Sequence, residues 1–271
     1  MGKFDNIAIL TDLDKTFLAD GSKMVQRNVD AIEYFKSEGG IFTISTGRMH
    51  HGLENTVIGV EKLLNAPALM CNGTYFYDFS KREVSCETFI DAELVIKTVQ
   101  FVHNLNMVRI IRGSARNGYL VESPDGNAAM SLRNHGINAI VCAPYEKWDS
   151  ENIYKLSFVD EAQTLIELEE ILKKEFAGRY EYNRSSPIQL ELQTVGVNKA
   201  KLIAPFKELY SKQGRELTVY ACGDNENDIA MLRAADVALC PSNAIDAVKA
   251  ICHKCLCSNN DGVIADLIYS L

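Results

Sequence analysis

The chain has 271 residues, of which 47% are hydrophobic and 24% charged, and its formal net charge is -8. This length allows a large hydrophobic core in one or two domains. The negative charge argues against a nucleic-acid partner, because proteins that bind duplexes carry a basic face. No apolar run is long enough to span a bilayer, so we also expect no membrane partner.

The N-terminal stretch lacks the apolar segment of a secretion signal. The chain has 8 cysteines, mostly inside apolar segments. Free thiols of this kind are typical of a reducing compartment, and we expect them to be buried. The sequence therefore predicts a cytoplasmic protein.

The first 82 residues alternate apolar strands with segments of helical periodicity. Strands are predicted at 7–10, 41–44 and 68–71, and helices at 27–36 and 51–64. Such alternation predicts a parallel sheet with right-handed crossovers. Each predicted strand is followed by polar residues, at the sheet edge where open α/β sheets bind their ligands.

The middle of the chain does not continue the regular alternation of strands and helices. A hairpin is predicted at 75–77 and 83–86, and is followed by helices at 92–104, 127–135 and 161–176 and strands at 108–112, 118–122, 153–159, 180–183 and 188–192. We predict an inserted α+β domain over 83–187, with linkers near 79–82 and 185–187. The flanking segments, 1–82 and 188–271, form the core domain.

The first pattern resumes after Asn198. Helices are predicted at 199–210, after 228, at 244–252 and after 262, and strands at 217–222, 237–239 and 255–257. The fold class predicted for the whole chain is α/β, a Rossmann-like parallel-sheet core interrupted by an α+β domain.

Two aspartates, Asp12 and Asp14, follow the first predicted strand with one residue between them. Ionisable groups at the end of a buried strand are costly unless they bind something. A lone pair of this kind would be read as solvated surface charge, but polar clusters also follow the other strands. The spacing therefore favours paired roles, with one carboxylate as nucleophile or metal ligand and the other as acid/base.

A second pair of aspartates follows the strand at 217–222. Asp224 and Asp228 are four residues apart, which places them on one face at the start of a helix. Carboxylates converging on one crevice would repel one another, and Mg²⁺, which takes oxygen ligands, relieves that repulsion. Lys199 and Thr46 offer a cation and a hydroxyl for an oxyanion. Together these groups supply what phosphoryl transfer needs.

Five motifs occur in order at the predicted strand ends, and a sixth near the C-terminus. They are Asp12-Leu-Asp-Lys-Thr16, Ser45-Thr-Gly-Arg48, Asn72-Gly73, Lys199, Gly223-Asp-Asn-Glu-Asn-Asp228 and Asn259-Asn-Asp-Gly-Val263. In this order they resemble the haloacid dehalogenase-like phosphatases, specifically the Cof-type branch with a large α+β cap domain. The resemblance covers the whole chain.

The resemblance implies a role for each matching residue. Asp12 would be the nucleophile that forms an aspartyl-phosphate, and Asp14 the general acid/base. Thr46 and Lys199 would bind the phosphoryl group. Further contacts to phosphate or substrate are assigned to Leu13, Gly47, Arg48, Asn72 and Asn227. Mg²⁺ would be held by Asp12, the Asp14 carbonyl and Asp224, with Asp228 in support.

The sequence departs from the family pattern at two places. Lys15 stands where glycine is usual, and Cys240-Pro-Ser-Asn243 stands where Met-Gly-Asn is common. Neither change removes a catalytic group.

Several residues admit two interpretations. Arg48 is equally a substrate clamp or a structural ion-pair partner, whereas His50 and His51 favour exposed helix positions over ligand roles. A zinc site at the C-terminal cysteines lacks a second ligand pair nearby, so core thiols are favoured; these are Cys252, Cys255 and Cys257. An exposed strand face is favoured over an anion site for Arg109, Arg112 and Arg116.

The combined prediction is a Mg²⁺-dependent phosphatase that acts on small phosphorylated metabolites such as sugar phosphates. We expect a monomer or a weak homodimer. Two alternatives stay open: a phosphomutase of the phosphomannomutase type, and a non-catalytic protein that binds a phosphorylated ligand.

Overall fold

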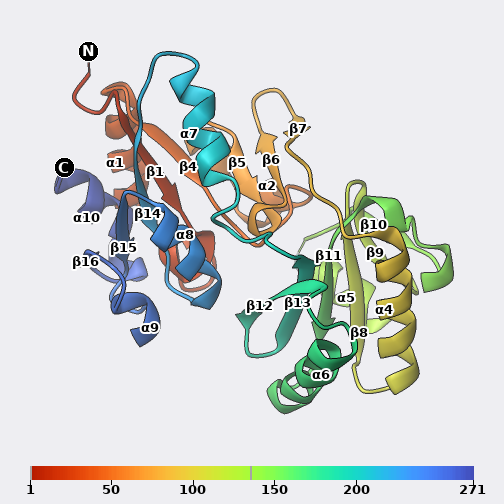
Figure 1. Ribbon diagram of the computed structural model, residues 1–271. Coiled ribbons are helices and arrows are strands. Elements are labelled where there is room, and N and C mark those ends of the chain that lie inside the picture. The colour runs from red at the N-terminus through yellow and green to blue at the C-terminus, as the bar shows by residue number, and fades with distance from the viewer. Residues whose placement is uncertain (1, 135) are drawn as a thin grey trace. The chain divides into compact units, whose positions relative to one another are not determined.

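The computed structural model describes residues 2–134 and 136–271. Its contacts divide the chain into two compact units, drawn in Figure 1. The first unit comprises Met1–His50, Val57–Glu87 and Asn198–Leu271, and the second comprises His51–Thr56 and Thr88–Val197.

A five-stranded parallel sheet forms the centre of the first unit. Its strand order is β16-β15-β14-β1-β4. The strands are β1 (Ile7–Thr11), β4 (Ile41–Ile44), β14 (Thr218–Cys222), β15 (Val237–Cys240) and β16 (Lys254–Cys255). The interior strand β1 begins with a continuous apolar run because both faces of the sheet are covered.

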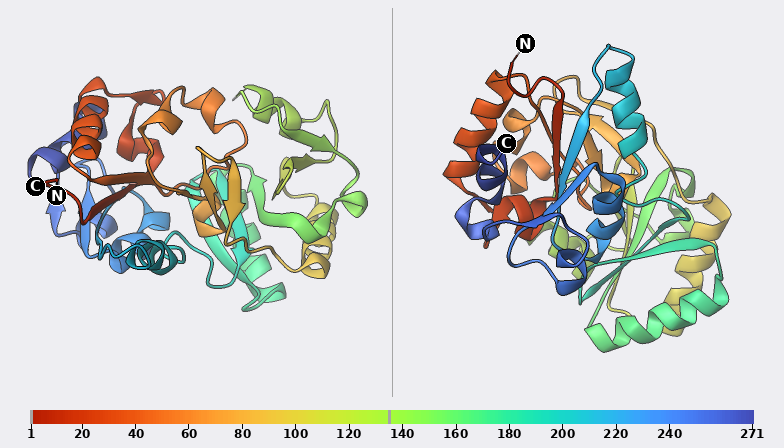
Figure 2. Two further views of the ribbon diagram at one scale, coloured as in Figure 1. Left: turned by 90° about the horizontal axis from the view of Figure 1, so that it is seen from above. Right: turned by 60° about the vertical axis from the view of Figure 1, so that its left-hand side comes forward.

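Helices cover the two faces of this sheet (Figures 1 and 2). On one face α1 (Gln26–Ser37) packs against α10 (Val263–Tyr269). On the other face lie α7 (Ile203–Ser211) and α8 (Ile229–Ala234), whose apolar side chains form one core cluster with those of β1 and β14. A short helix, α9 (Asp246–Lys249), follows β15. The predicted α/β class with a parallel-sheet core is confirmed.

The segment after β4 differs from the prediction in two respects. The single helix predicted at 51–64 is two short helices, α2 (Leu53–Thr56) and α3 (Val60–Leu63). Gly59, at φ +88°, separates them, because a left-handed residue ends helical geometry. The third predicted strand, β5 (Ala68–Met70), pairs antiparallel with β6 (Tyr75–Asp78) and meets the parallel sheet through a bridge from Leu69 to Ser45.

The predicted hairpin is confirmed and closes a three-stranded sheet. Its second strand is β7 (Glu83–Ser85), which pairs with β6. A second, smaller hairpin joins β2 (Leu18–Ala19) to β3 (Lys23–Met24). Short 3₁₀ turns occur at Cys71–Gly73, Tyr145–Lys147, Ser150–Asn152, Glu226–Asp228 and Asn259–Asp261.

The second unit is a six-stranded mixed sheet with order β10-β9-β8-β11-β13-β12. Its strands are β8 (Ile110–Ala115), β9 (Gly118–Val121), β10 (Ile140–Cys142), β11 (Ile153–Val159), β12 (Tyr180–Ser186) and β13 (Gln189–Thr194). Helices α4 (Ala92–Leu105) and α6 (Ala162–Glu175) share one apolar core with one face of this sheet. Helix α5 (Asn127–Asn134) packs with Tyr119 and Val121, so it lies over the opposite face.

Several details of this unit differ from the sequence prediction, among them β8, expected at 108–112, and β12, expected at 180–183. Strand β10 was not predicted, because it has three residues and a largely exposed edge position. The two units meet along the chain at 50/51, 56/57, 87/88 and 197/198, whereas the boundaries expected from the sequence are 82/83 and 187/188. The physical reason is strand pairing: β7 completes the sheet of the first unit, whereas β13 pairs with β11 and β12. The predicted end of α5, His135, lies outside the described residues.

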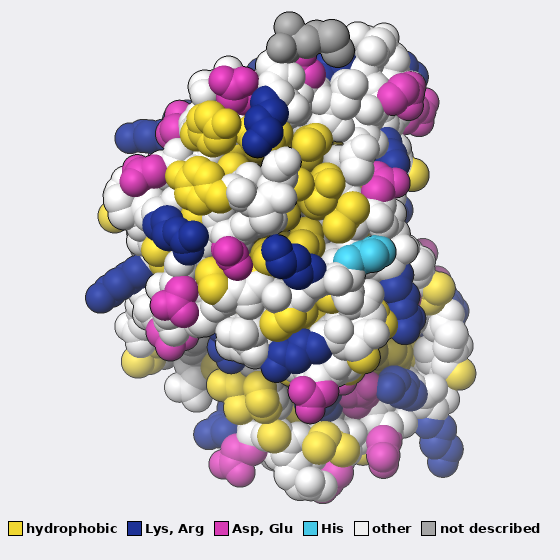
Figure 3. Space-filling model, turned by 90° about the vertical axis from the view of Figure 1, so that its left-hand side faces the viewer, with side chains coloured by type: hydrophobic (Ala, Val, Ile, Leu, Met, Phe, Trp, Pro, Cys, Tyr) yellow, Lys and Arg dark blue, Asp and Glu magenta, His cyan; other side chains and the backbone are white. Residues whose placement is uncertain are grey.

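The surface of the first unit mixes both signs of charge. Figure 3, which looks onto the side of α1 and α10, shows lysine and arginine side chains alternating with acidic ones around apolar side chains. The rings of Tyr34 on α1 and Tyr269 on α10 stack with their centroids 6.4 Å apart, and both side chains are partly exposed.

Candidate active site

The ends of three strands lie level at one edge of the parallel sheet. Thr11, the last residue of β1, is the register partner of Cys222 at the end of β14 and of Ile44 at the end of β4. The Asp12 backbone N–H donates to the Cys222 carbonyl at 2.9 Å. The polar residues that follow each strand therefore meet at this edge of the sheet.

Lys199 joins two of the aspartates that follow these strands. Its Nζ donates to Asp12 Oδ1 at 2.6 Å and to Asp228 Oδ1 at 2.5 Å. The Lys199 and Asp228 side chains are fully buried, and Asp12 is 7% exposed. A lysine that the sequence placed at the start of a helix, where exposure is usual, is thus the buried counter-ion of two carboxylates.

The third aspartate, Asp224, is held by a hydroxyl from the segment after β1. Thr16 Oγ1 donates to Asp224 Oδ1 at 2.8 Å. Asp228 Oδ2 accepts from the backbone N–H groups of Asp224 and Asn225 at 2.9 and 3.1 Å, which fixes the turn after β14. A side chain at Gly223 would overlap Asp228, since a Cβ there would lie 2.5 Å from Asp228 Cβ.

Burial and mutual repulsion set the charge state of this cluster. Burial raises the pKa of Asp12 well above its ordinary value; Lys199 acts to lower that pKa, and the neighbouring carboxylates raise it further. Burial and the Asp228 charge raise the pKa of Asp224 to about 6. Burial acts to lower the pKa of Lys199, but the charges of Asp12 and Asp228 outweigh it and keep the ammonium protonated.

The three carboxylates suit a hard divalent cation. One oxygen each from Asp12, Asp224 and Asp228 lies within 4.8 Å of the others. Three buried carboxylates beside one lysine leave negative charge to be balanced, and oxygen donors match Mg²⁺. The residues present therefore fit the ion that the sequence suggests.

Asp14, in contrast to this group, is exposed. Its carboxylate accepts two hydrogen bonds from Arg48, from Nε at 2.9 Å and from a terminal nitrogen at 2.6 Å. Arg48 is therefore an ion-pair partner here. The backbone between Asp14 and Thr16 turns sharply, with Lys15 at φ +59°, and Asn243 Nδ2 supports this turn by donating to the Lys15 carbonyl at 2.8 Å.

The remaining predicted phosphate-binding residues also lie in the first unit. Thr46 is buried, and its Oγ1 accepts from the Arg48 backbone N–H at 3.2 Å. The Asn72 backbone N–H donates to the Thr46 carbonyl at 2.9 Å, and a Cβ at Gly47 would lie 2.8 Å from Asn72 Oδ1. The other two residues are Leu13, whose side chain is fully buried in the core, and Asn227, which is half-buried in the loop after β14.

Sequence reasoning did not assign a role to Thr16, Asn243 or His50. Thr16 was visible as the hydroxyl after the two aspartates, but its bond to Asp224 spans 208 positions and leaves no local signal. His50 is half-buried rather than exposed on a helix; its Nδ1 lies 2.9 Å from Tyr75 Oη, and its ring stacks on Tyr77 at 4.0 Å.

Two expectations about side-chain exposure need correction. Several cysteines are exposed rather than buried: Cys86, Cys142 and Cys255, whereas Cys252 and Cys257 are half-buried. The three arginines of the second unit do not form one exposed face, because Arg112 has a buried Nε.

Comparison with known proteins decides the family. Residues 9–268 match the family model for haloacid dehalogenase-like hydrolases. The chain belongs to this family. The chain is 27% identical over 274 residues to the pyridoxal phosphate phosphatase YbhA of Escherichia coli (strain K12), covering 97% of each. It is 24% identical over 286 residues to the 5-amino-6-(5-phospho-D-ribitylamino)uracil phosphatase YwtE of Bacillus subtilis (strain 168), again covering 97% of each.

Solved structures show the same fold. A haloacid dehalogenase-like hydrolase from Bacteroides thetaiotaomicron superposes with a TM-score of 0.82 at 22% identity, covering 99% of each chain. The chain is a phosphoric monoester hydrolase of the haloacid dehalogenase-like family. Among the described residues, none of the helices is long and apolar enough to cross a membrane.

Proposed function

We propose that the chain hydrolyses small phosphorylated metabolites through a phosphoryl group carried on Asp12, with Mg²⁺ bound beside it. The observation that carries the proposal is the buried group of Asp12, Asp224 and Asp228 around Lys199 at the end of β1. Relatives named as phosphatases of pyridoxal phosphate and of a phosphoribitylamino-uracil support small substrates.

In the proposed reaction an Asp12 carboxylate oxygen attacks phosphorus, and the bond to the leaving oxygen breaks. Asp14 gives a proton to that oxygen. Water then attacks phosphorus, Asp14 takes the proton of the water, and the phosphoryl–Asp12 bond breaks to release phosphate. Lys199 and Thr46 would donate to the phosphoryl oxygens, and the ion pair with Arg48 would position Asp14.

Mg²⁺ would be held by Asp12, the Asp14 carbonyl and Asp224, with Asp228 in support. Bound there, it would offset the charge of the phosphoryl oxygens and allow an anionic nucleophile to approach them. Asp12 must be ionised to attack, and the cation would lower its raised pKa for that purpose.

The test is the Asp12→Asn variant, which keeps the shape of the side chain and removes the attacking charge. We expect phosphate release from pyridoxal 5′-phosphate or hexose phosphates to fall to background, while the circular dichroism spectrum is unchanged. Asp246→Asn, at an exposed position on α9, is the matched control and should retain wild-type turnover. Substantial turnover by pure Asp12→Asn protein would refute the covalent route.

The phosphomutase alternative is separated in the same assay. Hexose 1-phosphates and 6-phosphates are incubated with and without a bisphosphate activator, and free phosphate should be the main product. Isomer interconversion faster than phosphate release would show that the proposed reaction is wrong.

A further inference from the structure

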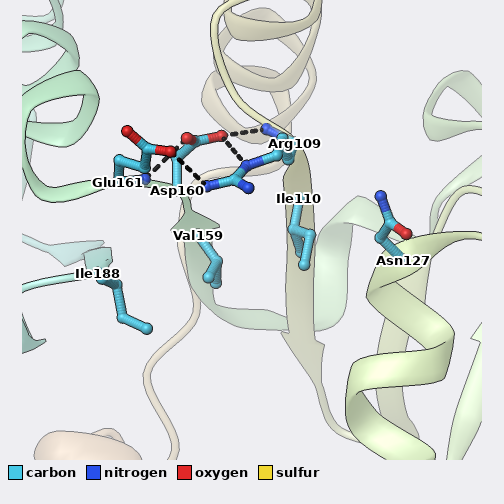
Figure 4. Close-up of a pocket in the computed structure, with 7 residues that line it drawn as sticks. All are labelled: Arg109, Ile110, Asn127, Val159, Asp160, Glu161 and Ile188. Carbon is cyan, nitrogen blue, oxygen red and sulfur yellow. Dashed lines mark hydrogen bonds and ion pairs between the residues drawn. The ribbon is translucent and has the colours of Figure 1, made fainter.

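The second unit contains a pocket of about 380 Å³ whose charged lining residues pair with one another (Figure 4). Asp160 Oδ2 accepts from the backbone N–H of Arg109 at 2.7 Å and from its Nε at 3.1 Å, and Glu161 lies 3.7 Å from the same guanidinium. The other lining residues are Ile110, Asn127, Val159 and Ile188. The protein itself thus compensates the arginine of this pocket. A set of contacts in the first unit, by contrast, converges on residues proposed for the reaction.

The wide turn that follows β1 is held from outside by three asparagines. It covers Leu13–Phe17 and is closed by the Phe17 N–H, which donates to the Asp12 carbonyl at 3.2 Å. Three backbone carbonyls of this segment each accept from an asparagine Nδ2: Lys15 from Asn243 at 2.8 Å, Phe17 from Asn28 at 3.3 Å and Leu18 from Asn259 at 3.0 Å. The donors belong to α1 and to the loops after β15 and β16, so distant parts of the chain hold this turn.

Asn243 contacts the turn at its strained residue. Lys15 has φ +59°, a left-handed conformation that is unfavourable for a residue with a β-carbon. The other end of the Asn243 amide is also fixed, because the backbone N–H of Asn259 donates to Asn243 Oδ1 at 3.0 Å. Asn259 is itself 2% exposed and bonded to Leu18. These contacts leave the Asn243 Nδ2 group directed at the Lys15 carbonyl.

The residues on either side of Lys15 both have proposed or observed roles in the site. Asp14 precedes it and is the proposed acid/base. Thr16 follows it, and its buried Oγ1 donates to Asp224 Oδ1 at 2.8 Å. Because the peptide units are planar, a rotation about the Lys15 backbone moves Asp14 and Thr16 as rigid groups. The conformation of this one residue therefore sets the direction of both neighbours.

We propose that Asn243 is a positioning residue for the reaction: its amide keeps Lys15 left-handed and thereby places Asp14 for proton transfer. The role of Asp14 rests on the proposed function. A single exposed hydrogen bond adds little to the stability of a whole chain. Displacement of a catalytic group by about 1 Å, however, can cost about a hundredfold in rate. Loss of the Asn243 amide should therefore affect turnover more than folding.

The first test compares two variants that remove the donor to the turn, Asn243→Ala and Asn243→Asp. The aspartate keeps an acceptor for the Asn259 N–H, so agreement between the variants assigns the effect to the Lys15 contact. We expect kcat/KM for pyridoxal 5′-phosphate, whose leaving alkoxide needs a proton, to fall at least tenfold in both. For p-nitrophenyl phosphate, whose phenolate leaves without one, the loss should be at least threefold smaller. Equal losses for the two esters would overturn the link to Asp14.

Asn260→Ala is the matched control for these variants. Asn260 is another exposed asparagine, in the same loop as Asn259, and its amide bonds to Asp20 rather than to the turn. Its kcat/KM for pyridoxal 5′-phosphate should stay within twofold of the wild type. A loss as large as that of Asn243→Ala would show a general effect of these loops and would overturn the assignment to Asn243.

A second test restores the turn by another route. Glycine adopts φ +59° without the penalty of a β-carbon, so Lys15→Gly added to Asn243→Ala should raise kcat/KM at least threefold. Lys15→Ala in the same background removes the same charge and keeps the β-carbon, and it should recover nothing. Equal recovery in the two double variants would assign the effect to charge and would overturn the proposal.

Hydrogen exchange of the Phe17 N–H, which closes the turn, measures the effect of Asn243 without turnover. Exchange should be at least tenfold faster in Asn243→Ala than in the wild type, and unchanged in Asn260→Ala. If the wild-type protein releases no phosphate, the proposed function is wrong, and faster exchange still supports the hold of Asn243 on the turn. Wild-type exchange or wild-type turnover in Asn243→Ala would overturn the proposal.

Discussion

Lys199 offsets part of the negative charge of the three buried carboxylates. Its ammonium contacts Asp12 and Asp228, and the structure leaves it no exposed surface. Removing one partner of a buried ion pair costs about 3–5 kcal/mol, because the remaining charge stays buried without compensation. The lysine is therefore a structural counter-ion as well as a proposed phosphate ligand.

The Lys199→Met variant should accordingly lower the free energy of unfolding by about 3 kcal/mol in EDTA. Added Mg²⁺ should recover part of this loss, since a cation can take over the compensation. Urea denaturation with and without Mg²⁺ measures both quantities. In the control Lys207→Met, which removes a partly exposed pair with Asp236, the loss should be below about 1 kcal/mol and insensitive to Mg²⁺. A Lys199→Met protein as stable as the wild type in EDTA would contradict this role.

At the scale of single residues, the sequence predicted those site residues whose spacing along the chain is distinctive. The two aspartates after β1 and the pair at 224 and 228 were found from spacing alone, and the structure brings Asp12, Asp224 and Asp228 together. Lys199 was selected through the family resemblance, because its contact with Asp12 spans 187 positions. The partial burial of Arg112 could not be predicted, since alternation along a strand does not say which face is covered.

The turn after β5 has room only for a glycine at position 73. Gly73 has φ +87°, and a Cβ there would lie 2.2 Å from the carbonyl oxygen of Asn198, the residue before Lys199. Both the backbone conformation and the close approach therefore require glycine.

Gly73→Ala should lower the free energy of unfolding by more than about 2 kcal/mol. It should also reduce turnover, because it displaces the segment that carries Lys199. Gly21→Ala is the matched control: Gly21 has φ +74°, but a Cβ at this position would have no heavy atom within 4 Å. Its cost should therefore be near 1 kcal/mol, about the backbone contribution alone. Chemical denaturation and kcat measure the two effects. Equal losses in both variants would show that the contact with Asn198 is unimportant.

Helix α6 is tied to β12 through one carboxylate. Glu169, on α6, accepts from Lys173 at 2.5 Å and from Arg184 Nε at 2.8 Å. Burial acts to raise the pKa of Glu169, but these two bonds outweigh it, and its folded pKa lies below 4.5. A carboxyl whose folded pKa is lowered adds stability above its unfolded pKa, and loses that contribution as the pH falls through the folded pKa.

Glu169→Gln should therefore cost about 1 kcal/mol of unfolding free energy at neutral pH. The gap between variant and wild type should close as the pH falls below 4.5. Urea midpoints of the two proteins across this range provide the measurement. A gap that persists or widens in acid would show that the carboxylate charge is not what stabilises this contact.

At the scale of elements, apolar runs predicted β1, β4, β14 and β15 to within one residue, because these strands are largely buried. The exposed edge strand β16, expected at 255–257, is Lys254–Cys255 and was predicted less well. Weak local signals caused the errors. A single glycine divided the helix expected at 51–64, and three largely exposed residues formed β10. Strand β5 pairs with β6, the next strand along the chain, and meets the parallel sheet only through the bridge between Leu69 and Ser45.

At the scale of the whole molecule, each unit has apolar core clusters of its own among the described residues. All three carboxylates of the candidate Mg²⁺ site lie in the first unit. Ligand binding stabilises the state that binds it, by about 2.7 kcal/mol at a hundredfold excess over Kd.

Calorimetry should therefore resolve two unfolding transitions, and Mg²⁺ should raise the midpoint temperature of only one of them. Leu156→Ala, in the buried core of the second unit, should lower the midpoint temperature of the other transition. The expected loss in the free energy of unfolding is about 2–5 kcal/mol. One transition that moves as a whole with Mg²⁺ and with Leu156→Ala would contradict this independence.

The division of the first unit into separate chain segments also has a consequence during synthesis. Ile7 of β1 is the register partner of Thr218 of β14, 211 positions later (218 − 7). At about 5–20 residues per second a ribosome needs roughly 10–40 s to cover that distance. During this interval the nascent β1 can pair with β4, but one of its edges stays open, while the inserted sheet emerges complete. Asp12 thus leaves the ribosome long before Lys199 and Asp228. Until Lys199 is translated, 187 positions later, the proposed nucleophile has no contact with this counter-ion.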